Sequence, residues 1–322
     1  RKIAALEGAD GALCFGAGMG AITASIMRYV RVNCHIIMVT TSYPDAKRFA
    51  LDYLARKFGV RTTLLRGDSV EEIAAAITDD TTLIYLESPS TSVFKMQDLE
   101  AVAALAKPRG IGTVIDNSYA TPLYQQPLKW GIDISLHTVS KYLCGHSNVV
   151  GGVVCSREEI IREMQNDERA LYASLLSPMD SYLLTMSLRT LPERMCRHGE
   201  NGRHVAAFLE SHPRVDRVFY PGSATYGQKD LFEKYMSGTT GLLSFVPRGT
   251  PEAVNRMIHD IDLFVHGPSW GGYESIISGK SVGMTPERCK EEDLVPGIVR
   301  LNIGLENVDT VVDALDKGLK TL

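Results

Sequence analysis

The sequence predicts an α/β protein in which a mostly parallel, doubly wound sheet is followed by a smaller α+β domain. Two observations favour this class. Between residues 11 and 156, short β-type runs alternate with helix-type runs, which is typical of a parallel sheet covered by helices. Beyond residue 210 the predicted strands are short and are interleaved with helical segments. We therefore expect a large domain over residues 1–195 and a small one over 196–322.

The first half of the chain supplies the elements of the large domain. Strand Ala12–Phe15 leads into a helix over Met19–Val30, and strand His35–Thr40 leads into a helix over Asp45–Phe58. After strand Arg61–Leu65, Ser69 and Glu72 have the spacing of a capping box, which predicts a helix start. Further strands are predicted at Thr82–Leu86, Thr113–Ile115, Ile134–His137 and Gly152–Cys155.

The second half changes character. Pro178–Leu209 has apolar residues at helical spacing and predicts one or two long helices that leave the large domain. The small domain is expected to contain strands Arg217–Phe219, Leu242–Phe245 and Val299–Ile303, with helices Pro251–Asp260 and Val308–Leu319.

Composition and charge exclude several classes of protein. The chain has 322 residues, 44% hydrophobic and 22% charged, which is ordinary for a folded globular protein. A net charge of −4 without a block of Lys and Arg argues against nucleic-acid and membrane-surface partners. The longest uncharged stretch, Gly11–Met27, is broken by glycines and too short to span a membrane. The six cysteines form no CxxC pair, and Arg1–Glu7 shows no signal peptide, so we expect reduced thiols and a cytoplasmic protein.

Polar residues and glycines follow the predicted strands at their carboxyl ends. Ligands of open α/β sheets bind at that edge, so these residues are expected to meet there. They comprise a glycine turn, an aromatic ring, acids and hydroxyls, and a lysine flanked by hydroxyls: Gly16, Gly18 and Met19; Ser42 and Tyr43; Glu87, Ser90 and Thr91; Asp116, Asn117 and Ser118; and Thr138, Ser140 and Lys141. A lysine in this setting suits a Schiff base with a cofactor whose phosphate lies near Thr138 and Ser140.

Two segments are compatible with other kinds of site. The run Gly16–Ala21 fits the GxGxxA turn of a nicotinamide-dependent oxidoreductase. That turn requires an acid at the end of the second strand, and here Asp45 arrives only at the start of the helix. Cys144 and His146 could suggest a metal, but no third or fourth ligand has suitable spacing, so we expect no metal.

Five segments, in this order, resemble the transsulfuration, or Cys/Met-metabolism, family of pyridoxal 5'-phosphate (PLP) enzymes. They are Leu86–Leu99, Val114–Leu123, Ser135–Gly152, Ser269–Ile276 and Ile298–Leu315. The run Ser-Trp-Gly-Gly-Tyr-Glu-Ser in the fourth is most similar to the cystathionine β-lyase branch. The resemblance implies the PLP-dependent aminotransferase-like fold, called fold type I, and PLP as the cofactor.

The resemblance also implies roles for individual residues. Lys141 would form the Schiff base with PLP, Asp116 would pair with the pyridine nitrogen, and Tyr43 would stack on the ring; Lys141 and Tyr43 are the expected catalytic residues. Arg300 would bind the substrate α-carboxylate. The other residues expected to bind cofactor are Gly18, Met19, Ser118, Thr138 and Ser140, and the other residues expected to bind substrate are Ser269 and Trp270.

The activity that the resemblance implies is β-elimination of L-cystathionine to homocysteine, pyruvate and ammonia, as part of methionine biosynthesis. The alternative within the family is γ-elimination or replacement, as in methionine γ-lyase or cystathionine γ-synthase. The family also implies a homo-oligomer, either a homodimer or a homotetramer, with the active site at the subunit interface. A Tyr-x-Arg element that reaches the neighbouring subunit's phosphate is expected upstream of Arg1. Thr91 stands where many relatives carry Asn, and Pro268 where the lyase branch often has an aromatic residue.

Overall fold

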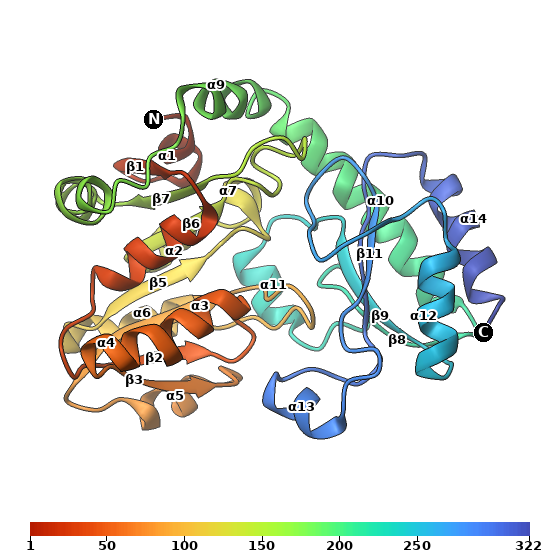
Figure 1. Cartoon of the computed structure of the whole chain (residues 1–322), viewed down its shortest axis with the longest axis horizontal. Coiled ribbons are helices and arrows are strands. Elements are labelled where there is room, and N and C mark those ends of the chain that lie inside the picture. Colours follow the sequence, from red (N-terminus) through yellow and green to blue (C-terminus); the bar gives the residue numbers. More distant parts are fainter.

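Seven strands form the first sheet, in the order β1-β7-β6-β5-β4-β2-β3, in a computed structural model that describes residues 1–322 (Figure 1). Strand β7 pairs antiparallel with both β1 and β6, whereas the remaining neighbours pair in parallel. The predicted α/β class with a mostly parallel sheet is therefore confirmed. The strands are β1 (Gly11–Phe15), β2 (His35–Val39), β3 (Arg61–Leu65), β4 (Thr81–Glu87), β5 (Gly112–Asp116), β6 (Ile134–Thr138) and β7 (Gly152–Ser156).

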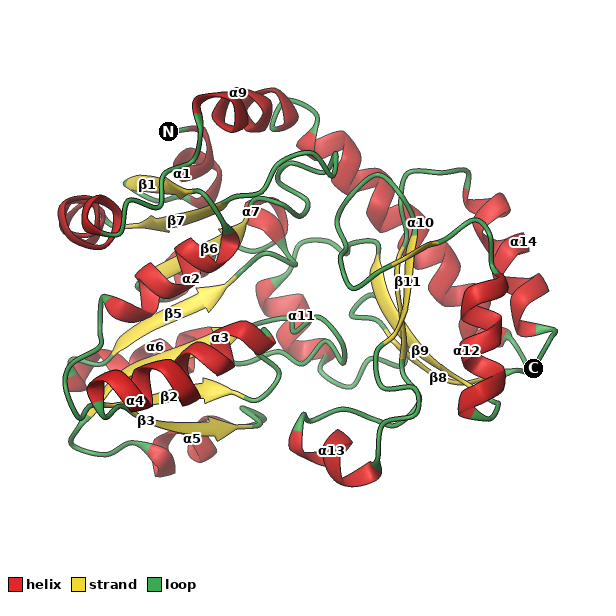
Figure 2. Cartoon of the chain, viewed as in Figure 1, coloured by secondary structure: helices red, strands yellow, loops and turns green.

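Both faces of this sheet are buried. Successive side chains of a strand point to opposite faces, so burial of consecutive residues shows that both faces are covered. In β2, Ile36 and Met38 belong to one apolar cluster, and Ile37 and Val39 belong to another. Helices cover the sheet on its two sides (Figure 2). They are α1 (Lys2–Glu7), α2 (Gly18–Met27), α3 (Pro44–Arg48), which continues through a π-helical stretch (Phe49–Leu54) into α4 (Ala55–Phe58), α5 (Val70–Ala76), α6 (Leu99–Ala106), α7 (Thr121–Tyr124) and α8 (Glu158–Met164).

The second sheet has five strands in the order β10-β11-β12-β9-β8, with helices packed on it. Its strands are β8 (Val215–Phe219), β9 (Leu242–Pro247), β10 (Val265–His266), β11 (Ile276–Gly279) and β12 (Val299–Asn302). The accompanying helices are α11 (Lys229–Tyr235), α12 (Pro251–Asp260), α13 (Pro286–Glu291) and α14 (Val308–Leu319).

Two helices connect the sheets, α9 (Pro178–Ser187) and α10 (Leu191–Ser211). The start of α10, with Leu191 and Met195, packs in the largest apolar cluster, which also contains residues of the first sheet. The end of α10, with Val205 and Leu209, packs in the cluster of the second sheet. The predicted boundary between residues 195 and 196 falls inside this helix, so the division into two domains stays a prediction.

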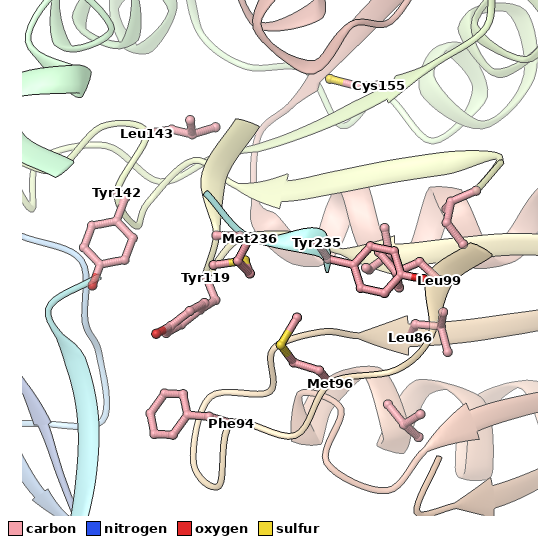
Figure 3. Close-up of a cluster of buried hydrophobic side chains, with 14 of the residues drawn as sticks. Leu86, Phe94, Met96, Leu99, Tyr119, Tyr142, Leu143, Cys155, Tyr235 and Met236 are labelled. Atoms are coloured by element: carbon pink, nitrogen blue, oxygen red, sulfur yellow. The ribbon is translucent and has the colours of Figure 1, made fainter. Parts of the chain in front are cut away.

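The largest apolar cluster extends from the first sheet towards the second (Figure 3). Phe94 in the loop after β4 and Tyr119 in the loop after β5 pack with ring centroids 5.5 Å apart. The same cluster includes Tyr235 of α11 and Trp270. This shared core holds loops at the carboxyl ends of the strands against the C-terminal half of the chain.

Two local predictions are corrected. The helix predicted over Met19–Val30 ends at Met27. Only half of the capping box forms: Ser69 Oγ accepts from the Glu72 N–H at 3.1 Å. The Glu72 carboxylate instead accepts from N–H groups in the preceding turn, at Gly67 (3.0 Å) and Asp68 (3.3 Å), because that turn folds back over the helix start.

The short elements α1, α7, α11, α13, β10 and β11 carry too few residues for a periodic pattern and were not predicted. No helix is long and apolar enough to cross a membrane.

Candidate active site

A cavity of about 500 Å³ lies at the carboxyl ends of the parallel strands, between the first sheet and loops of the C-terminal half. Every residue that the sequence analysis expected to bind cofactor or substrate lines it: Gly18, Met19, Tyr43, Asp116, Ser118, Thr138, Ser140, Lys141, Ser269, Trp270 and Arg300. The structure therefore brings the predicted residues together, while their individual roles remain predictions.

Lys141 lies in the turn that follows β6, and it contacts the loop that carries Trp270. Its Nζ donates to Ser269 Oγ at 2.8 Å and is 5.2 Å from the centroid of the Trp270 ring. Gly271 allows this approach: its φ is +84°, and a Cβ there would be 2.8 Å from the Tyr142 nitrogen. Burial, and then the positive charge of Arg300, lower the pKa of Lys141 to about 8.

The start of α2 and the end of β6 form a narrow polar cradle. A Cβ on Gly18 would lie 2.7 Å from Thr138 Oγ1, so only glycine fits at this closest approach. The Thr138 N–H donates to Ser118 Oγ at 2.7 Å, and Ser140 Oγ accepts from the Gly151 N–H at 3.1 Å. Helix α2 has no side-chain cap. Its first N–H groups are therefore available to an anion in the cradle.

Two carboxyl groups stand side by side at the ends of β4 and β5, where Glu87 is in register with Asp116. Asp116 Oδ1 accepts from the Ser118 N–H at 3.0 Å. Glu87 accepts from the Tyr43 N–H at 2.8 Å and from Thr91 Oγ1 at 3.3 Å. Burial raises the pKa of both acids, and with the adjacent Asp116 it raises the pKa of Glu87 to about 8. Neither acid forms an ion pair within the chain, so this wall of the cavity favours a cationic ligand group.

Arg300 of β12 faces the same cavity and is only 5% exposed. Its Nη1 donates to the Thr91 carbonyl at 3.2 Å, and its Nη2 donates to the Pro268 carbonyl. Burial lowers the pKa of Arg300 to about 10, which leaves the guanidinium charged at neutral pH. It forms no ion pair, and a buried cation without a carboxylate is stabilised when a ligand supplies one.

Three features of the cavity were not assigned from sequence. The sequence predicts Glu87 at the end of its strand, but the register of Glu87 with Asp116 follows only from the pairing of β4 with β5. Lys280 also lines the cavity. It follows the short strand β11, which the sequence pattern did not reveal. Tyr119 and Ile22 add apolar lining.

The nicotinamide alternative does not fit the topology. The GxGxxA turn follows β1, which lies at the edge of the sheet beside β7 and is not adjacent to β2. A dinucleotide fold needs those two strands next to each other in a βαβ unit. The structure contains no group of three or more His, Cys, Asp or Glu side chains that is arranged to hold a metal ion.

Comparisons with known proteins agree with one another. Residues 1–320 match the family described as Cys/Met metabolism PLP-dependent enzyme. The chain is 36% identical to L-methionine gamma-lyase of Porphyromonas gingivalis, with 100% of this chain and 82% of that protein covered. It is 33% identical to cystathionine gamma-lyase of Bacillus subtilis, with 98% and 84% covered. The crystal structure of metB from Corynebacterium glutamicum superimposes with a TM-score of 0.92 at 33% identity, covering 99% of this chain and 83% of that one.

Proposed function

The chain belongs to the Cys/Met metabolism family of PLP-dependent enzymes, and we propose from this premise that it is a carbon–sulfur lyase that acts by γ-elimination. The observation that carries the proposal is the single cavity that gathers Lys141, Asp116 and Arg300. Two of the relatives named above are γ-lyases, one of methionine and one of cystathionine, which supports γ-elimination over the β-elimination expected from the sequence.

The cavity suits PLP chemically. The cradle at Gly18 is narrow enough that a Cβ would obstruct it, and it offers N–H and hydroxyl donors to the phosphate. Asp116 is a buried acid without a cationic partner, and a protonated ring nitrogen is the cation that would favour its charged form. Lys141 has a lowered pKa, so its neutral, nucleophilic amine is populated near pH 8.

The chemistry divides between the cofactor and the side chains of the cavity. When bound, PLP supplies an electron sink that stabilises negative charge at the substrate Cα. Arg300 would hold the substrate α-carboxylate, which orients the Cα hydrogen. Lys141 Nζ would accept that proton and then move protons at Cβ and at the leaving sulfur, so that one base serves the whole sequence. The Ser269 hydroxyl, 2.8 Å from Nζ, would hold the amine in position.

Each elimination consumes one water molecule, which accounts for the oxygen of the keto acid and the release of ammonia. γ-Elimination from cystathionine releases cysteine, 2-oxobutyrate and ammonia, and from methionine it releases methanethiol in place of cysteine. β-Elimination from cystathionine releases homocysteine, pyruvate and ammonia, and needs proton removal only at Cα.

β-Elimination remains the second candidate because of Trp270. This indole is 7% exposed, lines the cavity and faces Lys141 Nζ, in a segment similar to the β-lyase branch. The Trp270 indole narrows the space around the Lys141 amine.

A product assay tests the proposal. Purified protein with PLP is incubated separately with cystathionine, cystine, methionine and O-acylated homoserines, and the keto acid is identified. We expect 2-oxobutyrate from cystathionine and from methionine. A predominance of pyruvate from cystathionine would favour the second candidate, whereas cystine can yield only pyruvate and does not discriminate. Lys141→Ala is the matched control and is expected to form neither product. A protein that releases no keto acid from any of these substrates would contradict lyase activity altogether.

A further inference from the structure

Lys280 places a cation in the active-site cavity that neither the cofactor nor the amino-acid end of the substrate requires. It is half-buried and lines the cavity together with Lys141 and Arg300. It follows β11, whose Ser278 pairs with Arg300 on β12. Lys280 therefore enters the cavity from the same sheet as Arg300, on the substrate side.

The ammonium of Lys280 has no anionic partner in the chain. Other half-buried lysines of the chain do have anionic partners: Lys47 Nζ contacts Glu292 Oε2 at 2.8 Å, and Lys95 Nζ contacts Asp68 Oδ1 at 2.8 Å. Glu87 is a nearby carboxyl, but its oxygens accept from the Tyr43 N–H and from Thr91. Lys280 forms no ion pair with it.

The surroundings of Lys280 favour an incoming anion. Burial lowers the pKa of Lys280 and the positive charge of Arg300 lowers it further, while the carboxyl groups of Glu87 and Glu292 offset this only in part. A half-buried ammonium near a guanidinium is destabilised unless a negative charge joins them. The phosphate cradle lies on the other wall, at α2 and β6, so the anion for Lys280 is one carried by the substrate.

We propose that Lys280 binds the second carboxylate of a thioether substrate that carries a carboxylate at both ends, and so selects such substrates over neutral thioethers. This inference rests on the proposed function. Arg300 would hold the carboxylate at the reacting end, and Lys280 the carboxylate on the leaving group. Within the family's range of substrates, the chain would then favour the cystathionine class over methionine.

Kinetics with two substrates test the assignment. We compare kcat/KM for cystathionine and for methionine in the wild type, Lys280→Gln, Lys280→Arg and the exposed control Lys229→Gln. In Lys280→Gln, loss of a charge-assisted contact should lower kcat/KM for cystathionine about tenfold or more. The kcat/KM for methionine should stay within about twofold of the wild type. Arginine should restore most of the loss, and the control should match the wild type. Equal losses for both substrates, or no loss for either, would overturn the proposal.

A binding experiment separates this inference from the proposed function. Thiodipropionate and 3-(methylthio)propionate are thioethers with two carboxylates and one, and neither has an amine that can react. Calorimetry on the PLP-loaded protein should show tighter binding of thiodipropionate, and Lys280→Gln should remove the difference. If the wild type binds both equally, the site does not exist. If it discriminates but turns over no sulfur amino acid, the proposed function fails while the site stands.

The same variant, Lys280→Gln, tests whether Lys280 instead holds the cofactor phosphate. Retention of PLP during dialysis is measured by the visible absorbance of the protein-bound cofactor. Lys280→Gln should retain PLP as the wild type does. Faster loss of PLP from this variant would assign Lys280 to the phosphate and refute binding of the substrate carboxylate.

Discussion

Lys141 carries most of the proposed chemistry, and its environment determines when it can act. Its hydrogen bond to Ser269 and its approach to Trp270 keep the amine on one side of the cavity. Burial removes water from the ammonium, and Arg300 adds repulsion, so the proton leaves more easily than from an exposed lysine. The amine is thereby prepared both to bind an aldehyde and to act as a base near neutral pH.

A pH prediction follows for Lys141. Only the neutral amine reacts with the PLP aldehyde, so the rate of PLP incorporation into apoprotein should rise with pH and level off above about 8. Arg300→Ala removes a cation that lowers this pKa, so the midpoint should move to higher pH. Stopped-flow absorbance from pH 6 to 10 measures the midpoint. A midpoint that stays in place in the variant would mean that Arg300 does not act on Lys141.

Arg300 should matter most for substrate binding. Arg300→Ala removes the planar, charged partner of the α-carboxylate, at a cost of about 2–4 kcal/mol of transition-state binding, or roughly 30- to 1000-fold in kcat/KM. Arg300→Lys should restore only part of the lost kcat/KM, because an ammonium lacks the planar fork of donors that a guanidinium offers to a carboxylate. Steady-state kinetics on the product assay report the loss. If alanine leaves kcat/KM within about twofold of the wild type, the carboxylate is held elsewhere.

At the scale of elements, helix α1 is linked to two strand ends by a fully buried polar pair. Glu7 Oε2 lies 2.9 Å from His137 Nε2, and both side chains are 0% exposed. Glu7 Oε1 also accepts from Asn117 Nδ2 at 3.4 Å. His137 precedes Thr138, and Asn117 follows Asp116. The helix therefore supports the loops that carry the cradle and the acid.

Removing Glu7 should weaken both stability and the site. Glu7→Ala leaves His137 buried without its partner and should lower the free energy of unfolding by about 3–5 kcal/mol. Glu7→Gln keeps a polar partner and should cost less. Urea unfolding of the PLP-loaded protein measures both variants. Exposed Glu159→Ala serves as control and should stay within about 0.5 kcal/mol of the wild type. A Glu7→Ala variant as stable as this control would show that the pair does not support the fold.

At the scale of the whole molecule, an exposed apolar surface lies beside the polar cradle at the start of α2. It consists of Leu171, Tyr172, Leu175, Met179 and Tyr182, with exposures from 50% for Tyr172 to 76% for Leu171. The Gly16 N–H donates to the Ser174 carbonyl at 3.3 Å, so this segment packs on the turn before α2. Exposed apolar side chains gathered in one segment of the chain favour association. We propose that a second copy of the chain covers this surface.

Association and cofactor binding should therefore be linked. The cradle offers hydroxyls and N–H groups, and its lysine is used by the PLP aldehyde, so a cation from a neighbouring subunit would complete the phosphate site. Dilution to monomer should release PLP. Sedimentation velocity at decreasing protein concentration, recorded at the absorbance of bound PLP, follows both events. A monomer that keeps PLP and full activity would contradict this linkage.

The sequence by itself determined the strands of the first sheet, their mostly parallel class and the residues at their carboxyl ends. Apolar runs such as those of β2 and β4 are local signals, since burial on both faces requires continuous apolar residues. Once the strands are located, parallel pairing brings Asp116 and Lys141 to one edge of the sheet. The ordered segments then indicated PLP, and the family match confirmed it.

Only the tertiary structure decided which distant segments complete the cavity. Packing between the two sheets brings Ser269, Trp270, Lys280 and Arg300 into the cavity that holds Lys141. The positive φ of Gly271 allows its loop to approach Lys141 closely. Both features depend on segments far apart in sequence. The pairing of Glu87 with Asp116 and the edge position of β1 depend likewise on strand order, which no local periodicity encodes. Lys280 stayed unnoticed because a lysine in a turn carries no pattern. Its significance arises from the nearby cation Arg300 and from the lack of an ion pair with any carboxylate of the chain.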